Sequence, residues 1–212
     1  MGEVGPIFRL NSQLVEKMKL EQIISFITEA DKLKSVKRKN YNGTGDRLEN
    51  SAEHSWQAAL VGLILSDQLA PGIDVLKVVK MLLIHDIVEI QAGDTFLYSD
   101  FNAADKFLKE QEAAKSIFGR LPEQQANDLL ELWMEFEVGN SRESLFARAV
   151  DHLVPVINNF NSGGKAWREN KVSYEKVYRV KSQVAGMVPE IWSIIESLII
   201  NARDLDLFGA KD

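Results

Sequence analysis

Each of the three histidines in the chain has an acidic neighbour, and one such pair closes a largely apolar run. His85 and Asp86 follow residues 78–84, and Glu89 comes one helical turn later. Burying an ionised carboxylate in such surroundings costs several kcal/mol unless it is paired or binds a cation. Because imidazole and carboxylate commonly bind divalent metals together, this motif is a candidate metal site. On this motif alone an alternative stays open, in which both acids flank a helix end and His85 is an ordinary core residue.

Asp151 is a second carboxylate beside an apolar helical stripe. The apolar residues of that stripe are Phe146, Ala149, Val150, Leu153, Val154 and Ile157. A carboxylate in this position needs a cationic partner. A salt bridge to Arg148 would provide one, and a metal ion would provide another. The presence of two such acids favours the metal.

Helices must position these side chains, because apolar residues recur at helical spacing and no stretch alternates as a β-strand does. We expect Ser51 to cap the second helix, the polar stretch 37–50 to be an exposed loop, and residues 1–18 to form an arm with a short helix. The eight expected helices cover residues 20–35, 51–69, 74–90, 102–118, 122–138, 143–160, 174–184 and 189–204.

These expectations describe an all-α fold, with residues 1–212 forming a single domain of about eight helices. Residues from about 20 to 160 would contain the metal site, and residues 173–206 would add the C-terminal helices. Trp56 lies in the second helix, and we expect it to face inward beside the site. His152 follows Asp151, and we interpret it as a packing residue or a support for that carboxylate.

Composition excludes several classes of function. The 212 residues are 45% hydrophobic and 26% charged, as in an ordinary globular protein. A net charge of −6 argues against a nucleic-acid binder or a binder of anionic membranes. With no cysteine, the chain has no thiolate nucleophile, disulfide or cysteine-ligated zinc. No apolar run reaches the roughly 18 residues of a membrane span, and no signal pattern opens the chain, so we expect a cytoplasmic protein.

The order His54, His85-Asp86, Asp151 on a helical chain resembles the HD superfamily of metal-dependent phosphohydrolases. The sequences around it, 49–56 and 85–94, resemble the branch of bacterial 5′-deoxynucleotidases and the related HD-domain-containing protein 2 group. The resemblance covers about residues 20–160 and implies an HD-type helical domain.

The resemblance also implies roles for individual residues. Glu89 and Asp94 would be the acid/base carboxylates, and Arg38 would bind the substrate phosphate. Family members commonly have an aromatic residue after this arginine, whereas this chain has Lys39, which affects base and sugar selectivity. The ligands of one divalent metal ion (manganese, cobalt, iron or zinc) would be His54, His85, Asp86 and Asp151.

The function implied is hydrolysis of (deoxy)nucleoside 5′-monophosphates by a homo-oligomer, a dimer. Other branches fit less well. Guanosine tetraphosphate hydrolases have an aspartate where this chain has Ile90, and phosphodiesterases with two metals need more histidines than His152 alone. Two alternatives remain: an HD phosphohydrolase of another phosphoester, and a non-catalytic HD-like module, which would typically lack some of these ligands and acids.

Overall fold

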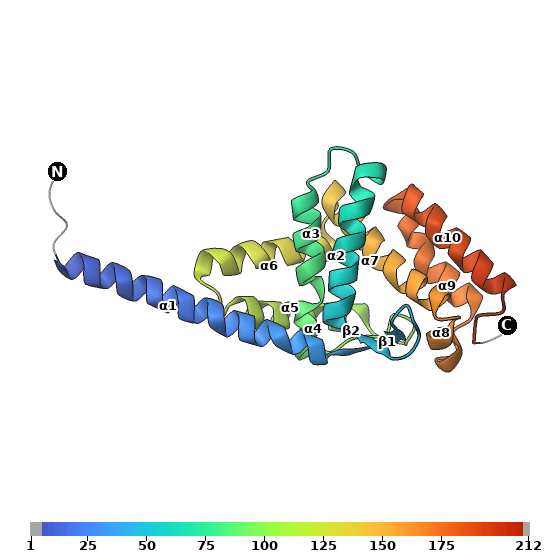
Figure 1. Cartoon of the computed structure of the whole chain (residues 1–212), viewed down its shortest axis with the longest axis horizontal. Helices are drawn as coiled ribbons and strands as arrows, with labels where there is room; N and C mark the ends of the chain where they lie inside the picture. The colour runs from blue at the N-terminus through green and yellow to red at the C-terminus, as the bar shows by residue number, and fades with distance from the viewer. Residues whose placement is uncertain (1–5, 210–212) are drawn as a thin grey trace.

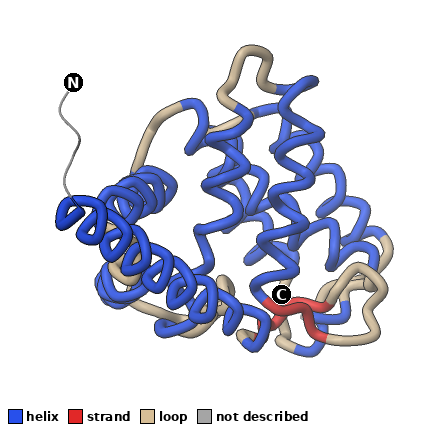
Figure 2. The backbone as a smooth tube through the Cα atoms, turned by 60° about the vertical axis from the view of Figure 1, so that its left-hand side comes forward, coloured by secondary structure: helices blue, strands red, loops and turns tan. Residues whose placement is uncertain are grey.

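The described part of the chain is helical apart from one small ribbon of two strands (Figures 1 and 2). The computed structural model describes residues 6–209, with side chains from residue 14 onward. The α-helices are α1 (Pro6–Ala30), α2 (Ser51–Leu69), α3 (Val75–Ile84), α4 (Glu89–Ala92), α5 (Ala103–Phe118), α6 (Glu123–Val138), α7 (Arg142–Asn161), α8 (Lys165–Glu169), α9 (Tyr174–Lys181) and α10 (Pro189–Asp204). The described residues also form three 3₁₀ turns, η1 (Asp31–Ser35), η2 (His85–Val88) and η3 (Ser182–Gly186). The two strands are β1 (Lys37–Tyr41) and β2 (Leu48–Asn50). The predicted all-α class is therefore confirmed.

The main core lies around α7, which packs against α2, α3, α6 and α10. The apolar stripe expected around Asp151 supplies this contact, and Val150, Leu153 and Val154 are buried in it. Helices α2 and α3 approach closely because Gly62 has no side chain. A Cβ atom at Gly62 would lie 2.7 Å from Leu82 Cδ1. This close approach packs the middle of α2 against α3.

The single helix expected over residues 74–90 is wrong, because η2 separates α3 from α4. The carbonyl of His85 accepts a hydrogen bond from the Trp133 indole (3.2 Å). The Glu89 N–H instead bonds to the carbonyls of Asp86 and Ile87. The α-helical hydrogen bonding is thus replaced at the His-Asp motif.

The exposed loop expected over residues 37–50 contains the antiparallel pair β1–β2, in which Lys37 lies opposite Asn50 and Tyr41 opposite Leu48. Apolar alternation could not reveal this hairpin because polar contacts anchor it. Asn159 donates to Asn40 (3.0 Å), for example, and so attaches the hairpin to α7.

The N-terminal expectation is also wrong where the structure describes it. Residues 6–30 form one helix, α1, rather than an arm and a separate helix, and residues 1–5 of the expected arm lie outside the described residues. Figure 1 shows α1 extending away from the other helices. Its C-terminal turns contact the body through Phe26, which packs on Phe118 with 6.3 Å between ring centroids.

Trp56 does not face inward as expected, since it is 63% exposed on α2. It shares the outer face of that helix with Leu60, Leu63 and Ile64, which are also exposed. Among the described helices, none has the length and apolar character needed to cross a bilayer.

Candidate active site

His54, His85 and Asp151 converge from α2, η2 and α7. Asp151 Oδ1 lies 2.7 Å from His54 Nε2 and 3.4 Å from His85 Nε2. One potential ligand atom from each of the three residues lies within 4.8 Å of the others. Three segments far apart in sequence therefore place two imidazoles and a carboxylate around one point.

A capping box fixes the start of α2 and so the position of His54. The cap is Asn50 rather than the expected Ser51. Its side chain accepts from the Glu53 N–H (3.0 Å), while the Glu53 carboxylate accepts from the Asn50 N–H (3.2 Å). This reciprocal pair satisfies two backbone donors that a helix leaves free at its N-terminus. His54, in the first turn, is then buried facing Asp151.

His85 has the orientation of a metal ligand. Its Nδ1 atom is 2.8 Å from the Leu82 carbonyl, to which it donates, so the lone pair is on Nε2. The buried Nε2 atom makes no hydrogen bond, although Asp86 Oδ1 lies 3.2 Å and Asp151 Oδ1 3.4 Å away. An Nε2 atom that faces two carboxylate oxygens needs either a proton or a metal ion between them.

The distances between the candidate ligand atoms also fit a bound metal ion. Metal–ligand bonds of about 2.0–2.2 Å allow ligand atoms to lie up to about 4.4 Å apart. Asp86 Oδ2 lies 4.0 Å from His54 Nε2, within that limit. However, Asp86 is not part of the compact group formed by His54, His85 and Asp151. Its role as a fourth ligand stays a prediction.

The charged groups of this cluster shift one another's pKa values. Burial opposes protonation of His85, but the Asp86 and Asp151 carboxylates outweigh it and raise its pKa to about 9. Burial would raise the pKa of Asp151, but hydrogen bonds with His54 and His85 and the charges of both rings hold it well below its usual value. A proton and a metal ion compete for the same imidazole lone pair, so metal affinity should fall at acidic pH.

Arg148 does not neutralise Asp151, which removes the salt bridge considered from the sequence. Its guanidinium donates to two backbone carbonyls instead, those of Glu137 (3.4 Å) and Gly139 (2.6 Å). Asp151 therefore makes its close ion-pair contacts with His54 and His85, and the charge of Lys181 also acts on it.

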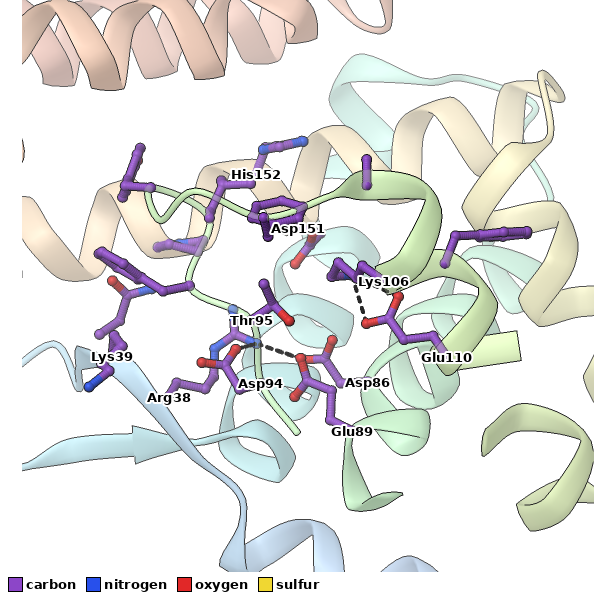
Figure 3. A pocket seen from close by; sticks show the side chains of 18 of the residues that line it. Arg38, Lys39, Asp86, Glu89, Asp94, Thr95, Lys106, Glu110, Asp151 and His152 are labelled. Atoms are coloured by element: carbon purple, nitrogen blue, oxygen red, sulfur yellow. Dashed lines mark hydrogen bonds and ion pairs between the residues drawn. The ribbon is translucent and has the colours of Figure 1, made fainter. Parts of the chain in front are cut away.

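Arg38 lies among four carboxylates at the base of the site (Figure 3). Nη1 donates to Asp86 Oδ2 (2.8 Å) and Nε donates to Glu49 Oε1 (3.1 Å). Nη1 also lies 3.8 Å from Asp94 Oδ1 and 4.0 Å from Glu89 Oε1. The residue expected to bind phosphate is thus beside both expected acid/base residues. Its partner Glu49 was not assigned a role from the sequence.

Glu89 and Asp94 differ from ordinary surface carboxylates. Burial, with the Asp86 charge next in size, raises the pKa of Glu89 to about 9, although Arg38 opposes the shift. The Ser51 hydroxyl donates to Glu89 Oε2 (2.6 Å). Burial also raises the pKa of Asp94, again against Arg38. Such shifts are typical of residues that exchange protons with a substrate.

A cavity of about 400 Å³ opens onto this cluster. Sequence reasoning missed four charged residues that line it: Lys106, Glu110, Glu137 and Lys181. The pair Lys106–Glu110 (2.6 Å) has the i, i+4 spacing of a helical ion pair, a signal that was present in the sequence. Burial, followed by the charge of Glu110, raises the pKa of Glu137 to about 7.

Comparison with known proteins agrees with this geometry. Residues 30–192 match the HD domain. The chain belongs to the HD-domain family. The resemblance drawn from His54, His85-Asp86 and Asp151 is therefore confirmed.

Solved structures resemble this HD-domain chain over most of its length. A protein of Magnetospirillum magnetotacticum MS-1, described as a predicted metal-dependent phosphohydrolase, is 34% identical and superposes with a TM-score of 0.84 over 91% of this chain and 100% of that one. A conserved hypothetical protein of Pyrococcus furiosus, at 22% identity and a TM-score of 0.58 over 85% of this chain and 99% of that one, shares the fold.

Curated relatives of this HD-domain chain are more distant. The 5′-deoxynucleotidase HDDC2 of Dictyostelium discoideum is 24% identical over 166 residues, which are 75% of this chain and 87% of that protein. The human protein of the same name is 28% identical over 136 residues. That match covers 64% of this chain and 65% of the human protein, somewhat less than two thirds of its length.

Proposed function

We propose that this HD-domain chain is a metal-dependent phosphomonoesterase that removes the phosphate from (deoxy)nucleoside 5′-monophosphates. The observation that carries the proposal is the group of His54, His85 and Asp151, because its Asp151 lines a cavity that Arg38 and Glu89 also line. The names of the curated relatives and of the Magnetospirillum neighbour support the same reaction class.

Four residues would hold one divalent ion: His54, His85, Asp86 and Asp151. Two imidazoles and two carboxylates suit manganese, cobalt, iron or zinc, with coordination positions left over. When bound, the ion supplies positive charge that stabilises the transition state of phosphoryl transfer. The unpartnered Nε2 of His85 supports this donor set.

Glu89 and Asp94 would divide the proton transfers. With its pKa raised to about 9 despite the Arg38 cation 4.0 Å away, Glu89 is protonated at neutral pH in the metal-free chain, so it can donate a proton to a leaving oxygen. Asp94, whose pKa is raised less, can accept a proton from the attacking water. Both lie within 4.0 Å of Arg38, which holds them near the phosphate it would bind.

Arg38 retains donors for a substrate. A guanidinium has five N–H groups, and the Asp86 and Glu49 contacts use Nη1 and Nε, which leaves the Nη2 group. A planar donor fork suits phosphate oxygens, which a lysine at this position would not reproduce.

The rest of the cavity would hold the nucleoside. Its volume of about 400 Å³ is within the range typical of small-molecule sites. Phe96, Tyr98, Phe101 and Phe107 line it and offer apolar surface to a sugar or base. Lys39, exposed at the rim in place of an aromatic residue, provides no such surface, so we propose only a modest preference for deoxyribose.

A substrate panel tests the proposal. The chain is stripped with a chelator, reloaded with manganese, cobalt, iron or zinc in turn, and assayed for phosphate release from 5′- and 3′-nucleotides, ribo and deoxy. We expect activity only with added metal, and the fastest release from 2′-deoxynucleoside 5′-monophosphates. A generic aryl phosphate is the control, and equal or faster release from it would contradict the nucleotide assignment.

We also propose that the chain forms the expected homodimer. The supporting observation is apolar surface left in solvent, on α1 at Leu20, Ile24 and Ile27 and on α2 at Trp56. Exposed apolar surface of this extent is typical of interaction sites. Sedimentation equilibrium should give twice the chain mass, and a monomer at all concentrations would contradict the proposal.

A further inference from the structure

The basic residues that line the cavity differ in their partners. They are Arg38, Lys39, Lys106 and Lys181. Arg38 and Lys106 donate to carboxylates, and Lys39 is exposed. Lys181 is only 1% exposed, and the hydrogen bonds of its amine both go to His152, which is not a carboxylate. Lys181 therefore brings a buried positive charge to the cavity without a hydrogen-bonded counter-ion.

The last turn of α9 places this amine beside the metal site. Lys181 Nζ lies 3.1 Å from His152 Nδ1 and 3.0 Å from the His152 carbonyl oxygen. His152 directly follows Asp151 on α7. An ammonium group has three donors, and these two acceptors leave one N–H for a group in the cavity.

Hydrogen bonding fixes the orientation of His152, and with it the amine. The Lys181 ammonium only donates, so His152 Nδ1, 3.1 Å away, accepts through its lone pair and the ring is neutral. Because Nδ1 accepts from Lys181, the ring proton is on Nε2. The Gln183 amide nitrogen lies 3.1 Å from His152 Nε2, and the amide turned by 180° places its oxygen there to accept a hydrogen bond from this N–H. Burial lowers the pKa of Lys181 to about 8, which leaves most of the amine charged at neutral pH.

We propose that Lys181 binds a phosphoryl oxygen of the substrate, and of the inorganic phosphate released from it, through this third N–H. The proposal rests on the function proposed above insofar as it takes the substrate to be a phosphate monoester. It assigns a phosphate-binding role to the C-terminal part of the fold, in addition to Arg38 on β1.

The charge favours phosphate over a neutral oxygen of the nucleoside. In a poorly hydrated site, an ammonium gains more from a dianion than from a hydroxyl or carbonyl. Lysine commonly binds phosphate as a point charge. Arg38 already neutralises carboxylates, so Lys181 is the buried cation with more to gain when an anion enters.

Binding of inorganic phosphate to the full-length chain tests the proposal by isothermal titration calorimetry, with competition by phosphate in the hydrolysis assay as a second readout. Lys181→Met removes the amine, and Lys181→Gln keeps a hydrogen-bond donor without the charge. Arg179→Met is the matched control, because it removes an exposed cation from the same helix. Thermal melts establish that each variant is folded, and the Gln variant replaces the Met variant if the latter is not.

We expect the folded Lys181 variants to bind phosphate about tenfold more weakly or worse, as for the loss of a hydrogen bond between charged groups. Arg179→Met should stay within about twofold. The kcat/KM of every nucleotide should fall by a similar factor. Unchanged phosphate affinity in the Lys181 variants, or a loss confined to particular bases, would overturn the proposal.

These measurements separate the two proposals. If wild-type protein fails to hydrolyse nucleotides but phosphate binding still depends on Lys181, the nucleotidase assignment fails and the Lys181 site stands. If nucleotides are hydrolysed and phosphate inhibits wild type and the Lys181 variants equally, the Lys181 site fails and the nucleotidase assignment stands.

Discussion

Helices α7 and α1 are similar in length, at 20 and 25 residues, but opposite in surroundings. Helix α7 packs against α2, α3, α6, α8 and α10, whereas α1 contacts mainly η1 and α5 through its C-terminal part and otherwise extends away (Figure 1). Apolar residues such as Leu153 are buried on α7, while Ile24 on α1 is 61% exposed.

This difference in packing explains why the candidate metal site includes a residue of α7 and none of α1. A metal ligand must be held within a fraction of an ångström, and only packed neighbours can hold it. Asp151 has such neighbours on α7, and no candidate site residue lies on α1. Variants on the two helices should therefore differ in both activity and stability.

The largest effect should come from Asp151→Ala on α7. The substitution removes the oxygen that lies 2.7 Å from His54 Nε2 and 3.4 Å from His85 Nε2. We expect loss of the divalent ion and a fall in kcat of roughly 10³-fold or more, because the ion contributes several kcal/mol to phosphoryl transfer. Metal content after dialysis and steady-state kinetics measure both.

Asp67→Ala is the control for this substitution, since Asp67 is an exposed carboxylate on α2. It should keep full metal content and full activity. Full occupancy in Asp151→Ala would show that Asp151 is not a ligand.

Glu89→Gln should separate chemistry from metal binding. The substitution keeps the shape of the side chain but removes the exchangeable proton. We expect kcat to fall by about 10²–10⁴-fold, as for loss of a positioned acid or base, with metal content unchanged. An exposed glutamate on α5, Glu112, provides the matched Gln variant. Unchanged kcat would leave Asp94 as the remaining candidate.

The comparison of the two helices can be tested directly by stability. Leu153→Ala removes a buried side chain from α7 and should lower the free energy of unfolding by about 2–5 kcal/mol. Ile24→Ala on α1 should change it by less than about 0.5 kcal/mol when the protein is monomeric. Urea titrations at low protein concentration measure both values, and equal losses would show that α1 is packed in solution.

The smallest expected effect is a pH-dependent change in the free energy of unfolding, and it comes from Glu137. Because the pKa of Glu137 is raised to about 7 in the folded chain, from 4.5, the folded state binds more protons than the unfolded state between these values. Stability conferred by this site therefore falls as pH rises from about 4.5 to 7 and is level above that range. Glu137→Gln should remove this dependence and stabilise the protein by on the order of 1–3 kcal/mol at pH 8, but not at pH 4.

Thermal melts of wild type and Glu137→Gln across that pH range measure the effect. An equal shift in melting temperature at every pH would show that Glu137 does not titrate near 7. Glu131→Gln, at an exposed position on the same helix, should have no effect.

The long helices were predictable from the sequence because burying one face of a helix places apolar residues three or four positions apart. Helix α5 covers Ala103–Phe118, within one residue of the expected 102–118, and the Asn102 side chain caps it. The hairpin, the break at His85 and the full extent of α1 were not predictable. Contacts distant in sequence determine the first two, such as the hydrogen bond from the Trp133 indole to the His85 carbonyl.

The residues of the candidate site also include some that the sequence predicted and some that it did not. His85 and Asp151 stood out because burying polar groups beside apolar sequence is costly, and His54 was assigned from the resemblance to the HD superfamily. Glu137 and Lys181 did not, because a charged residue on an amphipathic helix is ordinary until the fold places it in a cavity.

The 3₁₀ turn η2 controls the angular position of two of these groups. A 3₁₀ helix advances about 120° per residue and an α-helix about 100°, so the difference from Asp86 to Glu89 is about 60°. Winding of the 3₁₀ type from Asp86 in η2 to Glu89 at the start of α4 nearly eclipses the two side chains, and Arg38 reaches both from one strand. A continuous α-helix with the same amino acids would rotate one carboxylate out of line with the other. In this segment the winding of the backbone, as much as the identity of the residues, brings the two carboxylates to the same arginine.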